Sequence, residues 1–229
     1  MSRKVETHRP ARSWGSGTSA IARLLLAAEE PVTQVAIAEV VGVTQPRASQ
    51  VLKQLTARAI VRSGTRGYVA TKRARLLDLY FERSRPALVH PEEGWYGTAQ
   101  LLDQVKHVVE LVSRTSPSIA VSADIGPDLL VPWRHPTVAI IYTQIELDLS
   151  KARLVRAEGR ADATVLVRTT EDQSLLRSFP PWPATVDSVP LADPVQQWRD
   201  LLELGGDDRR DAAARLRRAI LEHSISVAA

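Results

Sequence analysis

The feature that most constrains this chain is a pair of short helical patterns joined by a glycine. Thr33 is placed to cap a helix over Gln34–Val41, because its hydroxyl can accept a backbone N–H of the first turn. Gly42 follows, and glycine adopts the left-handed turn that ends a helix without strain. Thr44 is placed to cap a second helix, from Gln45 to about Arg58. The spacing predicts two helices separated by a tight turn.

The apolar residues of these two segments indicate a helix-turn-helix. This motif needs a small residue in its first helix, a glycine in the turn and an apolar residue just after it; Ala38, Gly42 and Val43 meet these needs. Apolar residues also recur at helical spacing, so one side of each helix is expected to be buried. The residues expected to point inward are Val35, Ala38 and Val41 from the first helix and Ala48, Val51, Leu52 and Leu55 from the second.

The flanking segments add a helix on one side and a hairpin on the other. A helix is expected over Thr18–Glu30, with Thr18 or Ser19 as its N-cap, and Pro31 ends it. Ile60–Ala70 alternates around a glycine-bearing tip, which indicates a β-hairpin. Helix, helix-turn-helix and hairpin in this order predict a winged helix-turn-helix. This stretch resembles the DNA-binding part of MarR-like and GntR-like bacterial regulators.

Charge divides the chain. The formal net charge is +4, but residues up to His90 carry 15 basic and 6 acidic side chains, whereas those from Pro91 carry 15 and 20. A basic part joined to an acidic part points to contact with nucleic acid or an anionic surface. The net charge changes sign between Pro86 and Pro91, which predicts a domain boundary at about residues 86–94. The expected units are a flexible basic arm over 1–17, a winged helix-turn-helix DNA-binding domain over 18–85 and a C-terminal α/β interaction or regulatory domain over 95–229.

The C-terminal domain is expected to mix helices and strands. Thr137–Tyr142 is a continuous, largely β-branched run that predicts a buried central strand, and Thr164–Arg168 predicts another. Asp193 is placed to cap a helix that runs to Leu204, and a last helix is expected to end near His223. The predicted fold class is α+β, an N-terminal winged helix-turn-helix domain followed by a mixed α/β domain.

The exposed side of the second capped helix carries side chains suited to DNA. Arginine can bond guanine, glutamine can bond adenine, and hydroxyls and lysine can hold phosphate. Arginines on the hairpin would reach phosphate or the minor groove, while Lys72, Arg73 and Arg75 are interpreted as a solvated helix face. The alternative for the whole set is the solvated face of an amphipathic helix. The candidate DNA-binding residues are Thr44, Gln45, Arg47, Ser49, Gln50, Lys53, Arg62 and Arg66.

Several chemistries find no support in the sequence. The chain has no cysteine, which excludes disulfides, Cys-ligated metals and a cysteine nucleophile. The five histidines form no i, i+4 pair beside a carboxylate, and no phosphate-cradling glycine loop is present. We therefore expect no enzyme activity, no cofactor and no metal. No apolar run could span a membrane and the first residues are charged, so we expect a cytoplasmic protein with no membrane partner.

One acidic pair keeps an enzyme alternative open. Asp124 and Asp128 stand four residues apart, as metal-dependent nucleotidyl transfer would need. The intervening Gly126-Pro127 favours a turn, with Asp128 as the cap of a helix. We prefer the turn, and keep a nucleotidyl-transfer enzyme with a DNA-binding appendage as the lesser alternative.

The closing segment, Asp193–Leu221, reads DPVQQWRDLLELGGDDRRDAAARLRRAIL. Together with Ile119–Tyr142 it resembles AbiEi-type antitoxin and transcriptional regulator proteins, in which a winged helix precedes an α/β domain. The resemblance implies DNA binding, autorepression and, in some members, neutralisation of a nucleotidyltransferase toxin. Asp124–Asp128 departs from the Gly/Ala-rich stretch expected of that family. The matching positions are Gln196 or Gln197, Asp200-Leu201, Gly205-Gly206 and Asp211-Ala212-Ala213.

These observations together predict a bacterial-type transcription regulator, a repressor that binds duplex DNA sequence-specifically. The helix over 45–58 would contact the major groove, and the wing over 60–70 the backbone or the minor groove. The expected partners are double-stranded operator DNA with inverted repeats, a second copy of the chain and a cognate toxin protein. The main alternative is an antitoxin that neutralises a nucleotidyltransferase-type toxin by protein contact.

Overall fold

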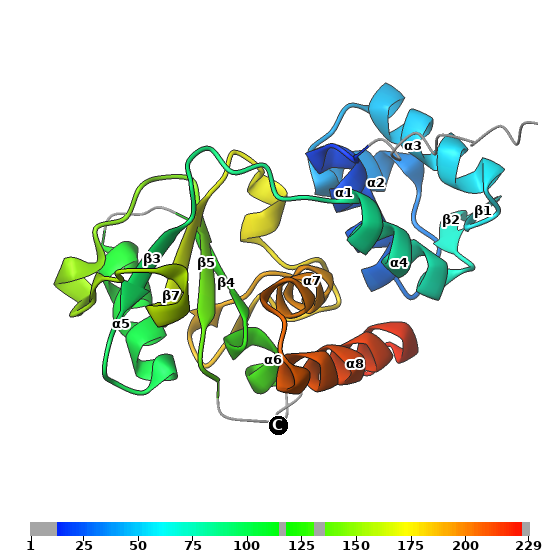
Figure 1. Ribbon diagram of the computed structural model, residues 1–229. Helices are drawn as coiled ribbons and strands as arrows, with labels where there is room; N and C mark the ends of the chain where they lie inside the picture. Colours follow the sequence, from blue (N-terminus) through cyan, green and yellow to red (C-terminus); the bar gives the residue numbers. More distant parts are fainter. Residues whose placement is uncertain (1–12, 115–117, 131–135, 226–229) are drawn as a thin grey trace, which may run out of the picture.

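The computed structural model describes residues 13–114, 118–130 and 136–225, which form an α+β structure with eight α-helices and a mixed sheet (Figure 1). The expected fold class is confirmed at this level. None of these helices is long and apolar enough to cross a membrane. The N-terminal part contains α1 (Ser16–Ala27), α2 (Gln34–Val41), α3 (Gln45–Ala57), β1 (Val61–Gly64), β2 (Gly67–Ala70) and α4 (Arg73–Arg83).

The C-terminal part alternates short strands with helices. Its strands are β3 (Glu93–Tyr96), β4 (Ile119–Ala123), β5 (Ala139–Thr143), β6 (Val155–Arg156), β7 (Val165–Thr169), β8 (Thr185–Val186) and β9 (Val189–Pro190). Its helices are α5 (Leu101–Ser113), α6 (Ile125–Leu130), α7 (Pro194–Leu204) and α8 (Asp207–Glu222), with 3₁₀ turns η1 (Leu149–Ala152), η2 (Arg160–Asp162) and η3 (Gln173–Leu176).

The caps of α2 and α3 lie where the sequence predicts them. The Thr33 hydroxyl accepts a hydrogen bond from the backbone N–H of Ala36 at 3.2 Å, and that of Thr44 accepts one from Arg47 at 3.4 Å. Gly42 ends α2 with a φ of 79°, in the left-handed region that favours glycine. The apolar stripe expected on α3, Ala48, Val51, Leu52 and Leu55, is buried throughout.

The predicted inward face of α2 is partly wrong. Val35 is 45% exposed, and the fully buried residue of this turn is Ile37, next to Ala38. Nearly every residue of α2 is apolar, so spacing alone does not select which side faces the core. Helix α1 also differs: it begins at Ser16, earlier than the predicted caps.

The predicted basic arm over 1–17 falls mainly on residues 1–12, outside the described part. Its last five residues do not form an arm. The backbone N–H of Trp14 donates to the carbonyl of Arg83 at 2.8 Å, and its side chain packs against the core. Helix α1 starts two residues later, so this stretch ties the beginning of α1 to the end of α4.

The main sheet has the strand order β4-β5-β7-β3-β6. Strands β5 and β7 are parallel, and the other neighbouring pairs are antiparallel. All five residues of β5 are buried between two neighbours, so the predicted central strand is confirmed. Strand β3 is not predicted; it begins at Glu93, two residues before the predicted start of the C-terminal domain at residue 95.

The two faces of this sheet differ in character. Val121, Ile141 and Val167 lie on one face and belong to the same apolar cluster as Val105 and Val108 of α5. The side chains that alternate with them point to the opposite face, toward α7. That opposite face is mixed: Ile140 and Leu166 belong to a second apolar cluster, and Ser122, Tyr142 and Arg168 are polar. The partners of these polar side chains on α7 are described below.

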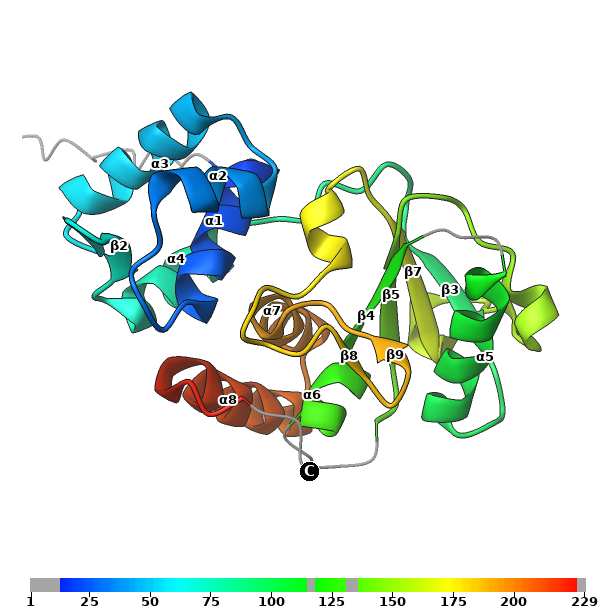
Figure 2. The same ribbon diagram turned by 180° about the vertical axis from the view of Figure 1, so that it is seen from behind.

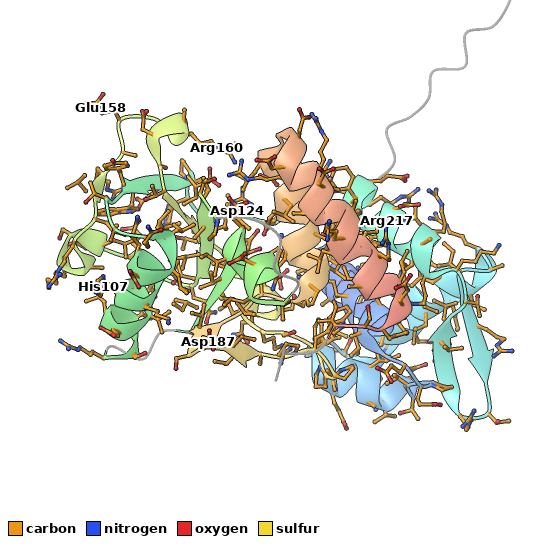
Figure 3. All side chains as sticks on the ribbon, turned by 90° about the horizontal axis from the view of Figure 1, so that it is seen from below. His107, Asp124, Glu158, Arg160, Asp187 and Arg217 are labelled. Atoms are coloured by element: carbon orange, nitrogen blue, oxygen red, sulfur yellow. The ribbon has the colours of Figure 1, made fainter. Side chains whose placement is uncertain are left out.

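Helices α7 and α8 lie between the sheet and the helices of the N-terminal part (Figures 1 and 2). Helix α1 is buried on all sides from Thr18 to Ala27, because α2, α3 and α4 pack on it and η3 and α8 also reach it. Arg217 projects from α8 (Figure 3), and its Nη2 lies 3.2 Å from Oδ1 of Asp78 of α4. The chain crossing between the two parts is held as well, since Val89 donates to the carbonyl of Thr169 at 2.8 Å.

Candidate nucleic-acid interface

The structure brings the predicted residues of α3 together on its outer side. Gln45, Arg47, Gln50 and Lys53 are exposed, and Ser49 is half-buried. They flank the buried apolar stripe, as an amphipathic helix requires. Thr44, also predicted, is exposed but its hydroxyl caps the helix. The side chains that remain at this surface are long, polar or basic.

Arg47 has a defined position on this surface. One of its guanidinium nitrogens donates to Gln50 Oε1 at 2.8 Å and another to Thr18 Oγ1 of α1 at 3.0 Å. Both partners are neutral, so the positive charge of Arg47 is not cancelled by these contacts. Such preorganisation lowers the conformational entropy lost when the arginine binds a ligand.

The hairpin β1–β2 carries the two other predicted arginines. Arg62 and Arg66 are both exposed. Arg66 lies 3.8 Å from Glu30, but both side chains are solvated, so this ion pair contributes little to stability. The hairpin is anchored to the chain before α2, because Val32 and Tyr68 exchange two backbone hydrogen bonds of 2.9 Å. Gly67 packs against the Val32 backbone with a φ of 127°, and a side chain there would collide with that backbone.

A cleft of about 570 Å³ lies beside this surface, among the start of α1, the outer side of α3 and the end of α4. We call it the arginine cleft because Arg47, Arg58 and Arg83 line it. Sequence reasoning missed the last two. Arg58 stands eleven residues after Arg47, three helical turns along the same side, so periodicity could have found it. Arg83 comes from another helix, and no local signal marks it.

The helix face predicted to be solvated is only partly so. Arg73 donates to the carbonyl of Leu26 at 2.6 Å and to that of Ile220 at 2.7 Å, joining α1 to α8. The prediction is wrong for this residue, because helix ends far along the chain present carbonyls to it. Lys72 and Arg75 are exposed, and Arg75 pairs with Glu82.

The acidic pair considered for metal chemistry is not arranged as a pair of ligands. The Asp124 carboxylate accepts bonds from the backbone of Thr137 and Val138, at 3.0 and 3.1 Å, and from Arg209 at 2.8 Å. Burial favours the neutral acid, but these bonds outweigh it and hold the pKa of Asp124 below its usual value. Asp128 lies inside α6 and is not its cap, contrary to the prediction. In the described ranges no group of three acidic or histidine side chains could hold a metal.

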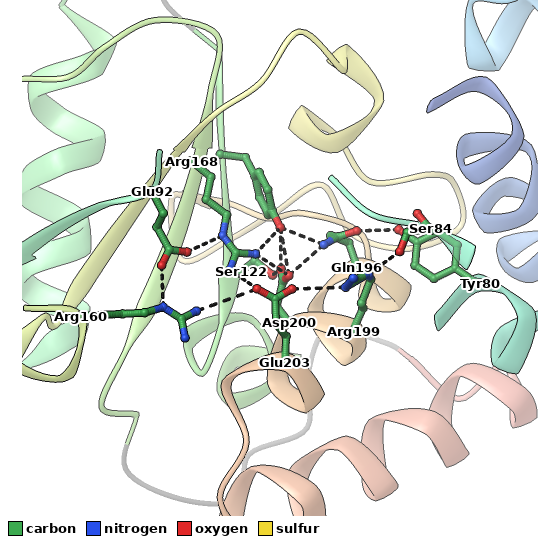
Figure 4. A network of polar contacts seen from close by, with 11 residues as sticks. Tyr80, Ser84, Glu92, Ser122, Arg160, Arg168, Gln196, Arg199, Asp200 and Glu203 are labelled. Carbon is green, nitrogen blue, oxygen red and sulfur yellow. Dashed lines mark hydrogen bonds and ion pairs between the residues drawn. The ribbon is translucent and has the colours of Figure 1, made fainter. Parts of the chain in front are cut away.

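A second polar cluster lies between the sheet and α7, centred on the fully buried Asp200 (Figure 4). Its carboxylate accepts hydrogen bonds from Ser122 at 2.5 Å, Tyr142 at 2.9 Å, Gln196 at 2.9 Å and Arg168 at 3.2 Å. Burial raises the pKa of the Tyr142 hydroxyl well above its ordinary value. Each of these contacts joins protein groups to one another, which favours a structural role for the cluster.

The cluster extends to both sides of α7. Toward the sheet, Arg168 donates to Glu92 at 2.6 Å and to Glu203 at 2.5 Å. Toward the N-terminal part, Gln196 accepts from the Tyr80 hydroxyl of α4 at 2.5 Å. Buried polar contacts therefore run without interruption from α4 across α7 to the sheet (Figure 4).

A separate buried ion pair joins the two parts. Arg23 of α1 is fully buried, and its Nε lies 3.1 Å from Asp193 Oδ2, an ion-pair distance without hydrogen-bond alignment. Arg23 also donates to the Ser174 hydroxyl at 2.6 Å. Burial disfavours its charged form, but Asp193 and the other neighbouring groups outweigh this and raise the pKa of Arg23. Asp193 meanwhile caps α7 by accepting from Val195 and Gln196.

Comparison with known proteins adds no family assignment. No protein-family model matches the chain, and no curated protein or solved structure matches it significantly.

Proposed function

We propose that this protein is a transcription regulator of the repressor kind that binds duplex DNA sequence-specifically. In this proposal α1 to α4 and the β1–β2 hairpin act as a winged helix-turn-helix. Helix α3 enters the major groove, where its arginine and glutamines meet base edges, and the hairpin contacts the backbone or the minor groove.

The observation that carries the proposal is the chemical make-up of one surface. Gln45, Arg47, Gln50 and Lys53 project from α3 beside a hairpin with two exposed arginines. This surface lies on the side of the N-terminal part that is turned away from α7 and α8 (Figure 1). A duplex could therefore approach it without meeting the C-terminal part.

Charge supports the same surface. From Val40 to Leu77 the sequence contains no Asp or Glu, and it contains eight Lys and Arg. This stretch includes all of α3 and the whole hairpin, so no carboxylate of its own weakens the attraction to phosphate. The arginine cleft adds Arg83 from the end of α4. Phosphate contacts of this kind supply affinity and make it dependent on salt.

The proposal is tested with a labelled duplex that spans the region upstream of the protein's own gene. Fluorescence anisotropy is recorded across a series of salt concentrations, with a shuffled duplex of equal length as competitor. We expect tight binding to the upstream duplex, weaker binding to the shuffled one, and affinity that falls steeply with salt. A Lys151→Ala variant, which removes one exposed charge from the C-terminal part, should bind as the parent does. Failure to bind either duplex at low salt would refute the proposal and favour the protein-contact alternative.

A further inference from the structure

A cleft of about 400 Å³ opens where the chain crosses from α4 to β3. We call it the junction cleft. The end of α4 and the crossing segment supply Phe81, Arg85, Pro86, Leu88 and Glu92, and the remaining wall comes from the sheet, η2 and α7. Its volume lies within the range of small-molecule sites. It is separate from the proposed DNA surface, since the two clefts share no lining residue.

Positive charge exceeds negative charge in this cleft. Four arginines line it, against two glutamates. Both glutamates are already engaged, Glu92 by Arg160 at 2.7 Å and Arg168 at 2.6 Å, and Glu203 by Arg168 and Arg199. Burial opposes ionisation of Glu92, but these arginines outweigh it and hold its pKa below the usual value. The carboxylates are therefore neutralised within the cleft wall (Figure 4).

Arg85 is the surplus cation. Its guanidinium donates to the backbone carbonyls of Phe81 and Ser84, both at 2.7 Å, and pairs with no carboxylate in the described residues. Arg199 also faces the cleft although its side chain is only 3% exposed, and its Nε donates to the carbonyl of Ser84. The guanidinium groups of Arg85 and Arg199 thus lie beside the same backbone carbonyl, that of Ser84, and both donate a hydrogen bond to it.

The rest of the lining is apolar. Phe81, Pro86 and Leu88 form the apolar wall of the cleft, and Leu88 is 38% exposed. An apolar side chain left open next to arginines is suited to a ligand that has an apolar body and one anionic group. Guanidinium groups bind carboxylates through paired, charge-assisted hydrogen bonds and also stack on aromatic rings.

We propose that the junction cleft binds a small aromatic monocarboxylate. The carboxylate pairs with Arg85, and the ring covers Phe81 and Leu88. Because the cleft is lined by α4, the sheet and α7 together, the bound molecule contacts both parts of the protein. The proposal does not rest on DNA binding, and its test uses no DNA.

The test is isothermal titration calorimetry of 1-naphthoate into the full chain. We expect saturable binding of one molecule per chain, with the neutral analogue 1-naphthalenemethanol at least fivefold weaker. An Arg85→Gln variant should weaken 1-naphthoate binding at least fivefold, because it removes the one arginine of the cleft lining that pairs with no carboxylate in the described residues. Arg75→Gln is the matched control: Arg75 is on the same helix, exposed and outside the cleft, and its loss should leave the affinity unchanged.

Three results would overturn the proposal. They are the absence of saturable 1-naphthoate binding, equal affinity for the neutral analogue, and equal affinity of the parent and Arg85→Gln. Circular dichroism of each variant establishes that it is folded before titration. Because Arg85 is exposed and its partners are backbone carbonyls, its replacement is expected to leave the fold intact.

Discussion

The arginines of the α3 and hairpin surface contrast with those of the junction between the two parts. Arg62 and Arg66 project into solvent, and Arg47 is held only by neutral partners. Arg23 and Arg168 are buried, and each is held by one or more carboxylates. The same type of side chain therefore lies in two different environments in one molecule. The buried guanidinium groups join segments of the chain, whereas in our proposal the exposed ones bind DNA phosphate and bases.

The difference teaches that a basic count does not locate a binding surface. The excess of basic residues before His90 includes Arg23 and Arg73, which bond to groups of the C-terminal part. What distinguishes the candidate interface is that its basic side chains are exposed. Helix α3 carries no Asp or Glu, and the pair of Arg66 with Glu30 on the hairpin is fully solvated. Substitutions in the two regions should therefore change different quantities, stability at the junction and DNA affinity at the surface.

The largest expected effect comes from the buried ion pair. Replacing Arg23 by Ala leaves Asp193 buried without its cation, which should lower the free energy of unfolding by about 3–5 kcal/mol. Chemical denaturation monitored by circular dichroism measures it. The matched control is Arg75→Gln, which breaks an exposed pair and should cost less than about 0.5 kcal/mol. If the two variants were equally stable, the buried ion pair would contribute no more than the exposed one, and the contrast between buried and exposed arginines would be wrong.

The next effect concerns Asp124, whose buried carboxylate holds Arg209 and two backbone N–H groups. Asp124→Asn should lower the free energy of unfolding by about 1–3 kcal/mol at neutral pH, because a charged acceptor is lost from these bonds. The folded pKa of Asp124 is depressed, so the parent's advantage is present above its ordinary pKa near 3.8 and disappears as the pH falls through the lower folded value. Denaturation curves of both proteins from pH 7 to pH 2 measure this; a constant difference would contradict it.

At the surface, Arg47→Ala should act on binding. If Arg47 bonds a guanine, the variant loses about 1–3 kcal/mol of specific DNA binding and discriminates less well at one base pair. The partners of its guanidinium, Gln50 and Thr18, are neutral, so no buried charge is left behind and the free energy of unfolding should change by less than about 1 kcal/mol. Anisotropy titrations with single-base-pair variants of the bound duplex test this prediction. An unchanged affinity for the parent duplex would remove Arg47 from the interface.

The smallest effect is expected from Lys53→Ala. Lys53 lies farther along the exposed side of α3, where we expect it to contact phosphate. The variant should bind all duplexes more weakly by a similar factor and reduce the slope of log affinity against log salt by about one. Lys151→Ala removes the same charge elsewhere and should leave the slope unchanged. A loss confined to one DNA sequence would instead assign Lys53 to base contact.

Local signals predict much of this fold. Thr33, Gly42 and Thr44 act within three or four residues of themselves, so their roles as caps and turn follow from sequence alone. The same holds for Asp193, which caps α7 as expected. Strand β3 escapes prediction because it is four residues long and begins Glu93-Gly94, without the alternation that marks a strand.

The junction could not be predicted from the sequence, because its partners are distant along the chain. Arg23 and Asp193 lie 170 positions apart in the sequence, and no periodicity links them. The candidate DNA surface is partly predictable, since helical spacing gives the exposed side of α3. Arg83 joins that surface only because α4 folds back beside α1 and α3, which is a tertiary effect.

Hydrogen exchange with and without the upstream duplex tests the central claim most directly, because it locates the DNA-contacting surface in the intact chain. We predict slower amide exchange on DNA binding in α3 and in the β1–β2 hairpin, with no change in α5 or in η1. The shuffled duplex at low salt should protect the same segments more weakly. Protection that appears in the sheet or α5 while α3 and the hairpin stay unchanged would contradict the account.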